Sequence, residues 1–225
     1  MSANPGADAG AGVSAGVSAG ASERDMASAR RDEITEAAAG VFLRYGFKKA
    51  SMDDLARAAR ISRQGLYLHF RTKDALFEAV LVQLVAQLRA AAVAAIDRDD
   101  LEPEDRLVGA FEAFCGYAVS SVASESFNEL METATSVGGP LVREAETEFV
   151  RGIAGLLTRT GVAETWAPAG IPPEELANHL YATSSGLKHL RTPPEEYRAR
   201  MRTAVRIVRA GGPGAGSGLG SGSAA

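Results

Sequence analysis

The sequence has little of several features that mark particular protein classes. Its single cysteine, Cys115, excludes a disulfide within the chain and fits a reducing compartment. No uninterrupted apolar stretch reaches the roughly 18 residues that a membrane-spanning helix needs. The N-terminus also lacks the charged start and dense apolar stretch of a secretory signal. From these absences we expect a cytoplasmic protein without a membrane segment or a membrane partner.

Residues that build enzymes and metal sites are also sparse. The chain has three histidines, and the two in its second half, His179 and His189, do not have the i, i+4 spacing of a helical metal site. No glycine-rich phosphate loop and no nucleophile motif occurs. Cys115 lies among aromatic residues, which favours a packed or pocket-lining thiol over a redox centre. We therefore expect no catalytic residue, no metal and no cofactor, and a helical enzyme with a scattered site remains a formal alternative.

Charge is distributed unevenly along the chain. Residues 24–75 contain 11 Lys and Arg against 7 Asp and Glu, a net charge of +4. Residues 76–225 contain 13 against 19, a net charge of −6. A basic segment on an acidic body suggests that a polyanion binds at one end, although a patch of this size is also common on solvated surface.

The two ends of the chain differ in composition from the middle. Overall, 46% of the residues are hydrophobic and 23% are charged, as in ordinary globular proteins. Residues 1–22 and 210–225 are dominated by Ala, Gly and Ser and have too little large apolar surface to offset the entropy lost on ordering. We predict that both are disordered tails and that the residues between them fold.

The periodicity of this middle region predicts an all-α fold. Apolar residues from Ile34 to Tyr45 recur at helical spacing, and Gly46 stands where a helix ends in a left-handed residue. Ser51, Ser62 and Thr72 are placed as N-caps of three further helices. The last of these is long, and helices are expected over about 73–97, 103–122, 125–135, 140–160, 172–190 and 194–209, with glycine and proline between them.

Two short helices, 51–59 and 62–70, carry the functional prediction. Only Arg60 and Ile61 join them, so the helices must cross steeply, with Ile61 between them. This is the construction of a helix-turn-helix, whose second helix enters the major groove of DNA.

The second of these helices has one apolar and one polar face. Leu66 and Phe70 are expected in the core. At the start of the helix, Arg63 can donate two hydrogen bonds to guanine, and Gln64 can pair with adenine. The major groove admits one helix led by long polar side chains, so these residues are candidates for reading bases.

Residues 34–81 resemble the N-terminal domain of TetR-family transcriptional regulators. The resemblance is carried by Tyr45-Gly46-Phe47, Ser51-Met-Asp-Asp-Leu-Ala, Ile61-Ser62 and Phe70-Arg-Thr-Lys-Asp-Ala-Leu. It implies a three-helix helix-turn-helix DNA-binding domain over 23–72. It also implies a larger helical ligand-binding and dimerisation domain over 73–209.

The resemblance also implies roles in DNA binding for individual residues. Arg63, Gln64 and Gly65 match base-reading positions, and Leu68 and His69 face the groove or its phosphates. The positions that match phosphate contacts are Ser51, Tyr67 and Lys73, with Lys48 and Lys49 nearby.

One residue departs from the family pattern. Arg60 stands where the family usually has glycine before the Ile or Val of the turn. A left-handed Arg60 carries a strain of roughly 1 kcal/mol. Either the turn is reshaped, or Arg60 tolerates the strain and adds a phosphate contact; we favour the second interpretation.

The C-terminal domain holds two further predictions that follow from the resemblance. Six residues are candidate walls of an effector pocket: Phe111, Phe114, Cys115, Phe127, Met131 and Phe149. Apolar stripes on the last two helices predict a four-helix dimer interface, although burial inside one subunit is the alternative. The interface residues are Leu180, Leu187, Met201, Val205 and Val208.

Together these observations predict a sequence-specific DNA-binding transcriptional regulator. We expect a ligand-responsive repressor that binds a double-stranded, palindromic operator as a homodimer and is controlled by a small-molecule effector. The alternative is a helical DNA-binding regulator without an effector, controlled by protein partners.

Overall fold

The computed structural model describes residues 14–120, 125–190 and 192–211, and over these ranges the chain consists of helices and their connections. The all-α prediction is confirmed. The elements are α1 (Ser14–Lys49), α2 (Met52–Ala58), α3 (Arg63–His69), α4 (Lys73–Ile96), α5 (Pro103–Ser120), α6 (Glu125–Arg159), a short 3-10 helix η1 (Ala163–Ala169), α7 (Pro173–His189) and α8 (Pro194–Arg209).

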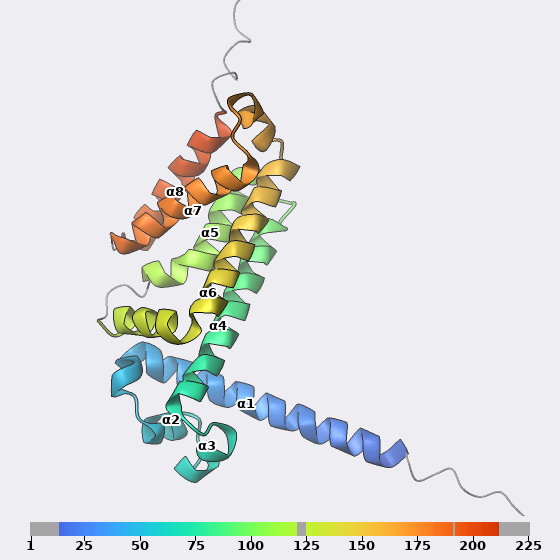
Figure 1. The fold of residues 1–225 in the computed structure, drawn as a ribbon, viewed down its shortest axis with the longest axis vertical. Helices are drawn as coiled ribbons and strands as arrows, with labels where there is room; N and C mark the ends of the chain where they lie inside the picture. The colour runs from blue at the N-terminus through green and yellow to red at the C-terminus, as the bar shows by residue number, and fades with distance from the viewer. Residues whose placement is uncertain (1–13, 121–124, 191, 212–225) are drawn as a thin grey trace, which may run out of the picture.

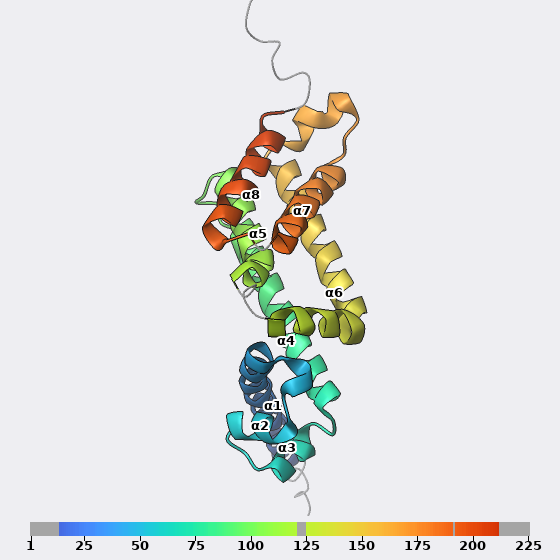
Figure 2. The same cartoon turned by 90° about the vertical axis from the view of Figure 1, so that its left-hand side faces the viewer.

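The molecule is elongated, with α1, α2 and α3 at one end and α5, α7 and α8 at the other (Figure 1). The long helices α4 and α6 run side by side between the two ends, and they are in contact. Turning the molecule shows α7 and α8 as an outer layer over α5 and α6 (Figure 2). The end that carries α3 is therefore well separated from the C-terminal helices.

Helix α1 begins much earlier than the sequence predicted. Residues 14–22 were expected in a disordered tail, but they form the first turns of α1. Three of these nine residues are alanine, and the stretch extends a helix that tertiary packing nucleates further along the chain. The remainder of the two predicted tails, 1–13 and 212–225, lies outside the described residues.

The three predicted N-caps are confirmed. The side chains of Ser51, Ser62 and Thr72 accept hydrogen bonds from backbone amides in the first turns of α2, α3 and α4. Ser51 also forms a capping box with Asp54. Each cap satisfies an amide that the helix itself leaves without a partner, so the caps fix where each helix begins.

Two apolar cores hold the fold together. The first contains Leu66 and Phe70 of α3 together with residues of α1 and α2. The second lies among α5, α6, α7 and α8. Helices α4 and α6 contribute to both: Phe77 of α4 belongs to the first core, and Ile96 of the same helix belongs to the second.

The first core extends past the domain boundary expected near residue 72. Leu76, Phe77, Val80 and Leu81 of α4 are buried against α1, and Ala134 of α6 joins them. The first two turns of α4 are therefore part of the core that supports the helix-turn-helix.

Helix α6 merges two predicted helices and keeps the predicted break as a kink. Gly138 has a non-helical backbone, and Pro140 lies two residues further on. A Cβ on Gly138 would lie 3.0 Å from Leu81 Cδ1, so glycine permits α6 to approach α4 closely at this point. The kink turns the first part of α6 across the end of the bundle near α1 (Figure 1).

The five residues predicted at the dimer interface lie inside a single chain. Leu180, Met201 and Val205 are fully buried, and Leu187 and Val208 are nearly so. They pack in the second core with residues of α5 and α6. This prediction is wrong because an apolar stripe reports that a face is covered but not which element covers it.

Within the described ranges, α4 is the one helix long and apolar enough to cross a membrane, with a mean hydropathy of 1.9 over its most apolar window. Polar residues such as Gln83 and Arg89 interrupt the apolar runs of α4 but leave its mean hydropathy high. In the fold, α4 contacts α1, α5 and α6. A core helix passes the same length and composition test, so the result is weak support for a membrane span.

Candidate nucleic-acid interface

The recognition helix α3 presents two different faces. Leu66 is fully buried and Phe70, its C-cap, is 2% exposed. Leu68, between them, is 84% exposed, and Arg63 and Gln64 are also exposed. An isolated leucine with this exposure contributes nothing to the core. The outer face of α3 is therefore free for a partner, as predicted.

Arg63 is held by two neighbouring side chains. Its Nη1 donates to Asp53 Oδ2 of α2 at 3.0 Å, and its Nη2 donates to Tyr67 Oη at 3.4 Å. The Tyr67 ring lies 5.7 Å from the guanidinium carbon. These contacts raise the pKa of Arg63, with the Tyr67 hydrogen bond as the first cause and the Asp53 charge as the second. The sequence did not single out Asp53.

Gly65 and His69 have structural roles within α3. The Gly65 amide donates to Ser62 Oγ at 2.9 Å, and a Cβ on Gly65 would lie only 3.2 Å from that oxygen. The backbone carbonyl of His69 accepts a hydrogen bond from Arg31 of α1. Base reading by Gly65 and groove contacts by His69 stay predictions, as does the phosphate contact of the exposed Ser51.

Lys73, the first residue of α4, contacts the carboxyl end of α1. Its Nζ donates to the carbonyl oxygens of Phe47 at 2.9 Å, Ala50 at 3.1 Å and Lys48 at 3.5 Å. It also lies 4.4 Å from the centre of the Phe47 ring. An ammonium has three donors, and here all three face the carboxyl end of α1. Lys73 therefore joins α4 to the end of α1, and its phosphate contact stays a prediction.

The turn before α3 has the left-handed conformation that the sequence suggested for Arg60. Among the described non-glycine residues, Arg60 has a positive φ, 55°. Its amide donates to the Arg57 carbonyl at 3.1 Å, and the following Ile61 amide donates to the Ala56 carbonyl at 3.0 Å. These hydrogen bonds hold the turn while Arg60 tolerates the strain. The phosphate contact of its side chain stays a prediction.

Two arginines of α1 contact the carboxyl ends of the helix-turn-helix. Arg30 donates to the carbonyl of Ala59, the C-cap of α2, at 3.4 Å. Arg31 donates to the carbonyl of His69, the last residue of α3, and its guanidinium lies 4.1 Å from the centre of the Phe70 ring. The two arginines therefore stabilise the negative ends of α2 and α3.

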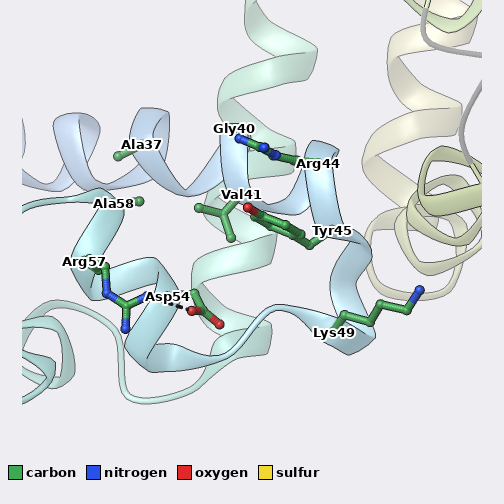
Figure 3. A pocket seen from close by; sticks show the side chains of 9 residues that line it. All are labelled: Ala37, Gly40, Val41, Arg44, Tyr45, Lys49, Asp54, Arg57 and Ala58. Carbon is green, nitrogen blue, oxygen red and sulfur yellow. Dashed lines mark hydrogen bonds and ion pairs between the residues drawn. The ribbon is translucent and has the colours of Figure 1, made fainter.

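A groove of about 600 Å³ lies between α1 and α2, beside the helix-turn-helix (Figure 3). Arg44, Tyr45 and Lys49 line it from α1, and the ion pair of Asp54 with Arg57 lines it from α2. Lys49 was considered for a phosphate contact, whereas no residue of α3 lines the groove. The basic surface of this end therefore extends beyond α3.

Four candidate pocket residues lie together in the second core. Phe114 stacks on Phe149 with ring centres 4.3 Å apart, and Phe111 meets Phe149 edge-on at 5.1 Å. Cys115 is buried in the same core. The side chains of the two other candidates, Phe127 and Met131, lie outside the described residues.

The amino-acid sequence of this end matches a known family. Residues 34–80 match the family described as "Bacterial regulatory proteins, tetR family". The HTH-type transcriptional repressor Rv1474c of Mycobacterium tuberculosis is 43% identical over 56 residues, which cover 25% of this chain and 30% of that protein. The A-factor receptor protein of Streptomyces griseus is 38% identical over 48 residues, covering 21% and 17%. These matches span about a third or less of the relatives' length.

The whole fold matches solved structures. The TetR family transcriptional regulator PfmR from Thermus thermophilus has a TM-score of 0.55 at 18% identity, over 79% of this chain and 97% of that one. The fatty acid degradation regulator FadR from Bacillus halodurans has a TM-score of 0.60 at 14% identity, over 81% and 95%. At these identities the likeness concerns the fold. With the helix-turn-helix sequence, it leads to one conclusion: residues 34–80 are a DNA-binding domain of the TetR family, and the chain as a whole has the fold of the TetR-family regulators that it matches.

Proposed function

We propose that this regulator is a ligand-responsive repressor that binds a palindromic operator as a homodimer. The observation that carries the proposal is the division of α3 into a buried face, with Leu66 and Phe70, and an exposed face, with Arg63, Gln64 and Leu68. The exposed face contributes no side chain to the core, and it has the residue types that read base edges.

Each side chain of this face has a different task in the proposal. Arg63 donates to O6 and N7 of a guanine, and Gln64 pairs with N6 and N7 of an adenine. Leu68 contacts a thymine methyl group, which is the apolar feature of the major groove. Tyr67 and the amides at the helix starts contact phosphates, which fix the register of the protein on the duplex.

The homodimer in this proposal uses the outer faces of α7 and α8. The inner faces of α7 and α8 are buried in the second core, but Ile207 of α8 is 62% exposed. On α7, Ala182 and Gly186 are exposed, and a Cβ on Gly186 would meet nothing within 4 Å. Small residues on α7 permit close approach of a partner helix, and exposed Ile207 provides apolar area. A two-fold dimer then places two copies of α3 about 34–36 Å apart, one turn of DNA.

The effector in this proposal is a small, largely apolar molecule. The rings of Phe111, Phe114 and Phe149 favour apolar ligands, and the hydroxyls of Ser184 and Tyr197, 2.7 Å apart in the same core, provide a polar anchor. Related names support this class: one relative is a receptor for A-factor, and one structural neighbour regulates fatty acid degradation. The ligand acts by binding one spacing of the two α3 helices better than the other.

The experiment that tests the proposal is selection of bound duplexes from a random pool by the full chain. We expect an enriched palindrome with half-sites one helical turn apart. Light scattering of the selected complex is expected to give two chains per operator. Enrichment of no sequence, or of a single half-site by a monomer, would overturn the operator proposal.

A second experiment separates the ligand-responsive repressor from a regulator controlled by protein partners. A panel of fatty acids and other apolar metabolites is screened for a rise in the melting temperature of the full chain. We expect a stabilising compound to release the selected operator and restore transcription from a promoter that carries it. A panel without a hit would contradict control by a small-molecule effector. Promoter activation by the protein alone would contradict the repressor role.

A further inference from the structure

The ion pair of Asp53 with Arg63 joins the first turn of α2 to the first turn of the recognition helix. Nη1 of Arg63 is 3.0 Å from Asp53 Oδ2, and Nη2 is 3.4 Å from Tyr67 Oη. The guanidinium is therefore held on two sides, by a carboxylate of one helix and a phenol of the other. The two charged residues are ten positions apart in sequence.

Local structure fixes this arrangement. Ser51 caps α2 so that Asp53 lies in its first turn, and Ser62 caps α3 so that Arg63 is its first residue. The left-handed Arg60 turns the chain between them. The two helix starts consequently meet, and they meet at the surface that faces the DNA in the proposed function.

The pair contributes little to the stability of the fold. The side chains of Arg63 and Asp53 are 57% and 53% exposed. Ion pairs with this exposure are screened by solvent and contribute little to folding. A carboxylate on a surface that binds a polyanion also opposes binding electrostatically. The placement of Asp53 therefore calls for a role in recognition.

A guanidinium has five N–H groups in a rigid plane. Asp53 and Tyr67 each accept one of them, which restricts the orientation of the plane and leaves the other donors for a base. On DNA with guanine at the matching position, Arg63 bonds the base and keeps its carboxylate partner. On other DNA, a phosphate that draws Arg63 away from Asp53 leaves the carboxylate facing the phosphates uncompensated.

We propose that Asp53 determines specificity by holding the Arg63 guanidinium for guanine and by penalising DNA that lacks guanine at that position. Asp53 is a positioning residue because it acts through Arg63 and does not itself bond a base. This inference rests on the proposed function of Arg63 as a base reader. The test distinguishes failure of the role of Asp53 from failure of base reading by Arg63.

The test compares the full chain with Asp53→Asn, Arg63→Ala and the double variant on three duplexes. The duplexes are the selected operator, the same operator with its guanine replaced at the Arg63 position, and an unrelated sequence. Asp74→Asn is the control, because it removes an exposed carboxylate from the first turn of α4 without touching Arg63. Affinity is measured over a range of salt concentrations.

We expect Asp53→Asn to reduce the preference for the operator over the guanine-replaced duplex by about tenfold, within the range that one bidentate base contact supplies. Its affinity for unrelated DNA should rise, with a salt slope steeper by about 1, because the freed Arg63 contacts a phosphate. In the Arg63→Ala background, Asp53→Asn should change binding to all three duplexes equally. Asp74→Asn should leave the preference unchanged.

Each other outcome has a defined meaning. If Arg63→Ala leaves the guanine preference intact, then Arg63 is not the base reader and the proposed function fails at this residue. If Arg63→Ala removes the preference but Asp53→Asn preserves it, then the role of Asp53 is refuted while base reading by Arg63 stands. Circular dichroism melts of each variant confirm that folding is retained, so that a loss of preference reports recognition.

Discussion

The guanidinium of Arg31 lies 4.1 Å from the centre of the Phe70 ring and donates to the carbonyl of His69. One side chain of α1 thus covers the carboxyl end of the recognition helix on both its apolar and its polar side. Because Phe70 is itself buried against α1 and α4, this contact connects the orientation of α3 to the body of the DNA-binding end.

The first prediction concerns this contact. Arg31→Ala should lower the free energy of unfolding by about 1 kcal/mol, since it removes a helix-end charge and a cation–π contact. Arg31→Lys retains the charge but loses the planar group. Its free energy of unfolding should lie between those of the parent protein and Arg31→Ala. Chemical denaturation measures the effect. Equal stability of all three proteins would mean that the contact contributes nothing.

The second prediction distinguishes two roles of Lys73. Lys73→Ala should lower the free energy of unfolding by about 1–3 kcal/mol, because three carbonyls at the end of α1 lose a charged donor. The slope of log affinity against log salt should not change, because the ammonium is not available to a phosphate. Lys49→Ala, at an exposed position, is the stability control. A stable variant with a slope reduced by about 1 would restore the phosphate contact expected from sequence.

The third prediction concerns the left-handed turn. Arg60→Gly should raise the free energy of unfolding by about 0.5–1 kcal/mol, because glycine adopts a positive φ without the steric cost that Arg60 bears. Arg57→Gly, inside α2, should lower it by about 1 kcal/mol and serves as the matched control. If Arg60→Gly also reduces the salt slope of DNA binding, then its side chain contacts a phosphate. Loss of stability in this variant would show that side-chain contacts outweigh strain.

The fourth prediction separates the inner and outer faces of the last two helices. Val205→Asp should unfold the C-terminal core, because it buries a charge without a partner. Ile207→Glu and Gly186→Leu should preserve the fold and weaken the dimer. Light scattering and thermal melts distinguish the two results. A stable dimer of both outer-face variants would locate the interface on other helices.

The fifth prediction concerns acid. The Ser51 hydroxyl and amide donate to the Asp54 carboxylate and hold the pKa of Asp54 below its ordinary value of 3.8. A lowered pKa in the folded state stabilises the fold above pH 3.8, and this contribution is lost as the pH falls through the folded pKa. The free energy of unfolding of Asp54→Asn should therefore differ from that of the parent protein at neutral pH, and the two values should converge in acid. A difference in the free energy of unfolding that stays constant from neutral pH into strong acid would contradict this assignment.

Local signals in the sequence were sufficient to predict the helix-turn-helix. Ser51, Ser62 and Thr72 act on amides within three residues of themselves, so their pattern is readable without the fold. The left-handed conformation of Arg60 was suggested by the family resemblance, since the family usually has glycine at this position. Burial of Leu66 and Phe70 follows from their spacing on a helix.

Long-range partners were not predictable in the same way. The carbonyls that Lys73 binds are more than 20 residues away in sequence, and nothing near Lys73 marks it as a cap. The apolar stripe of Met201 and Val205 indicates that this face of α8 is buried. It does not distinguish burial inside one chain from burial against a second chain. Asp53 was missed because carboxylates are common in the first turn of a helix, and its partner Arg63 lies on the next helix.

The two apolar cores share α4 and α6, and this has a consequence for dissecting the molecule. A fragment that ends at residue 72 lacks Leu76, Phe77 and Val80, which fill the space beneath α1 and α3. A fragment that begins there would expose those same side chains to water. Neither half is an autonomous module, and a cut at the predicted domain boundary would leave two pieces prone to aggregation. A minimal DNA-binding fragment must therefore retain at least the first two turns of α4.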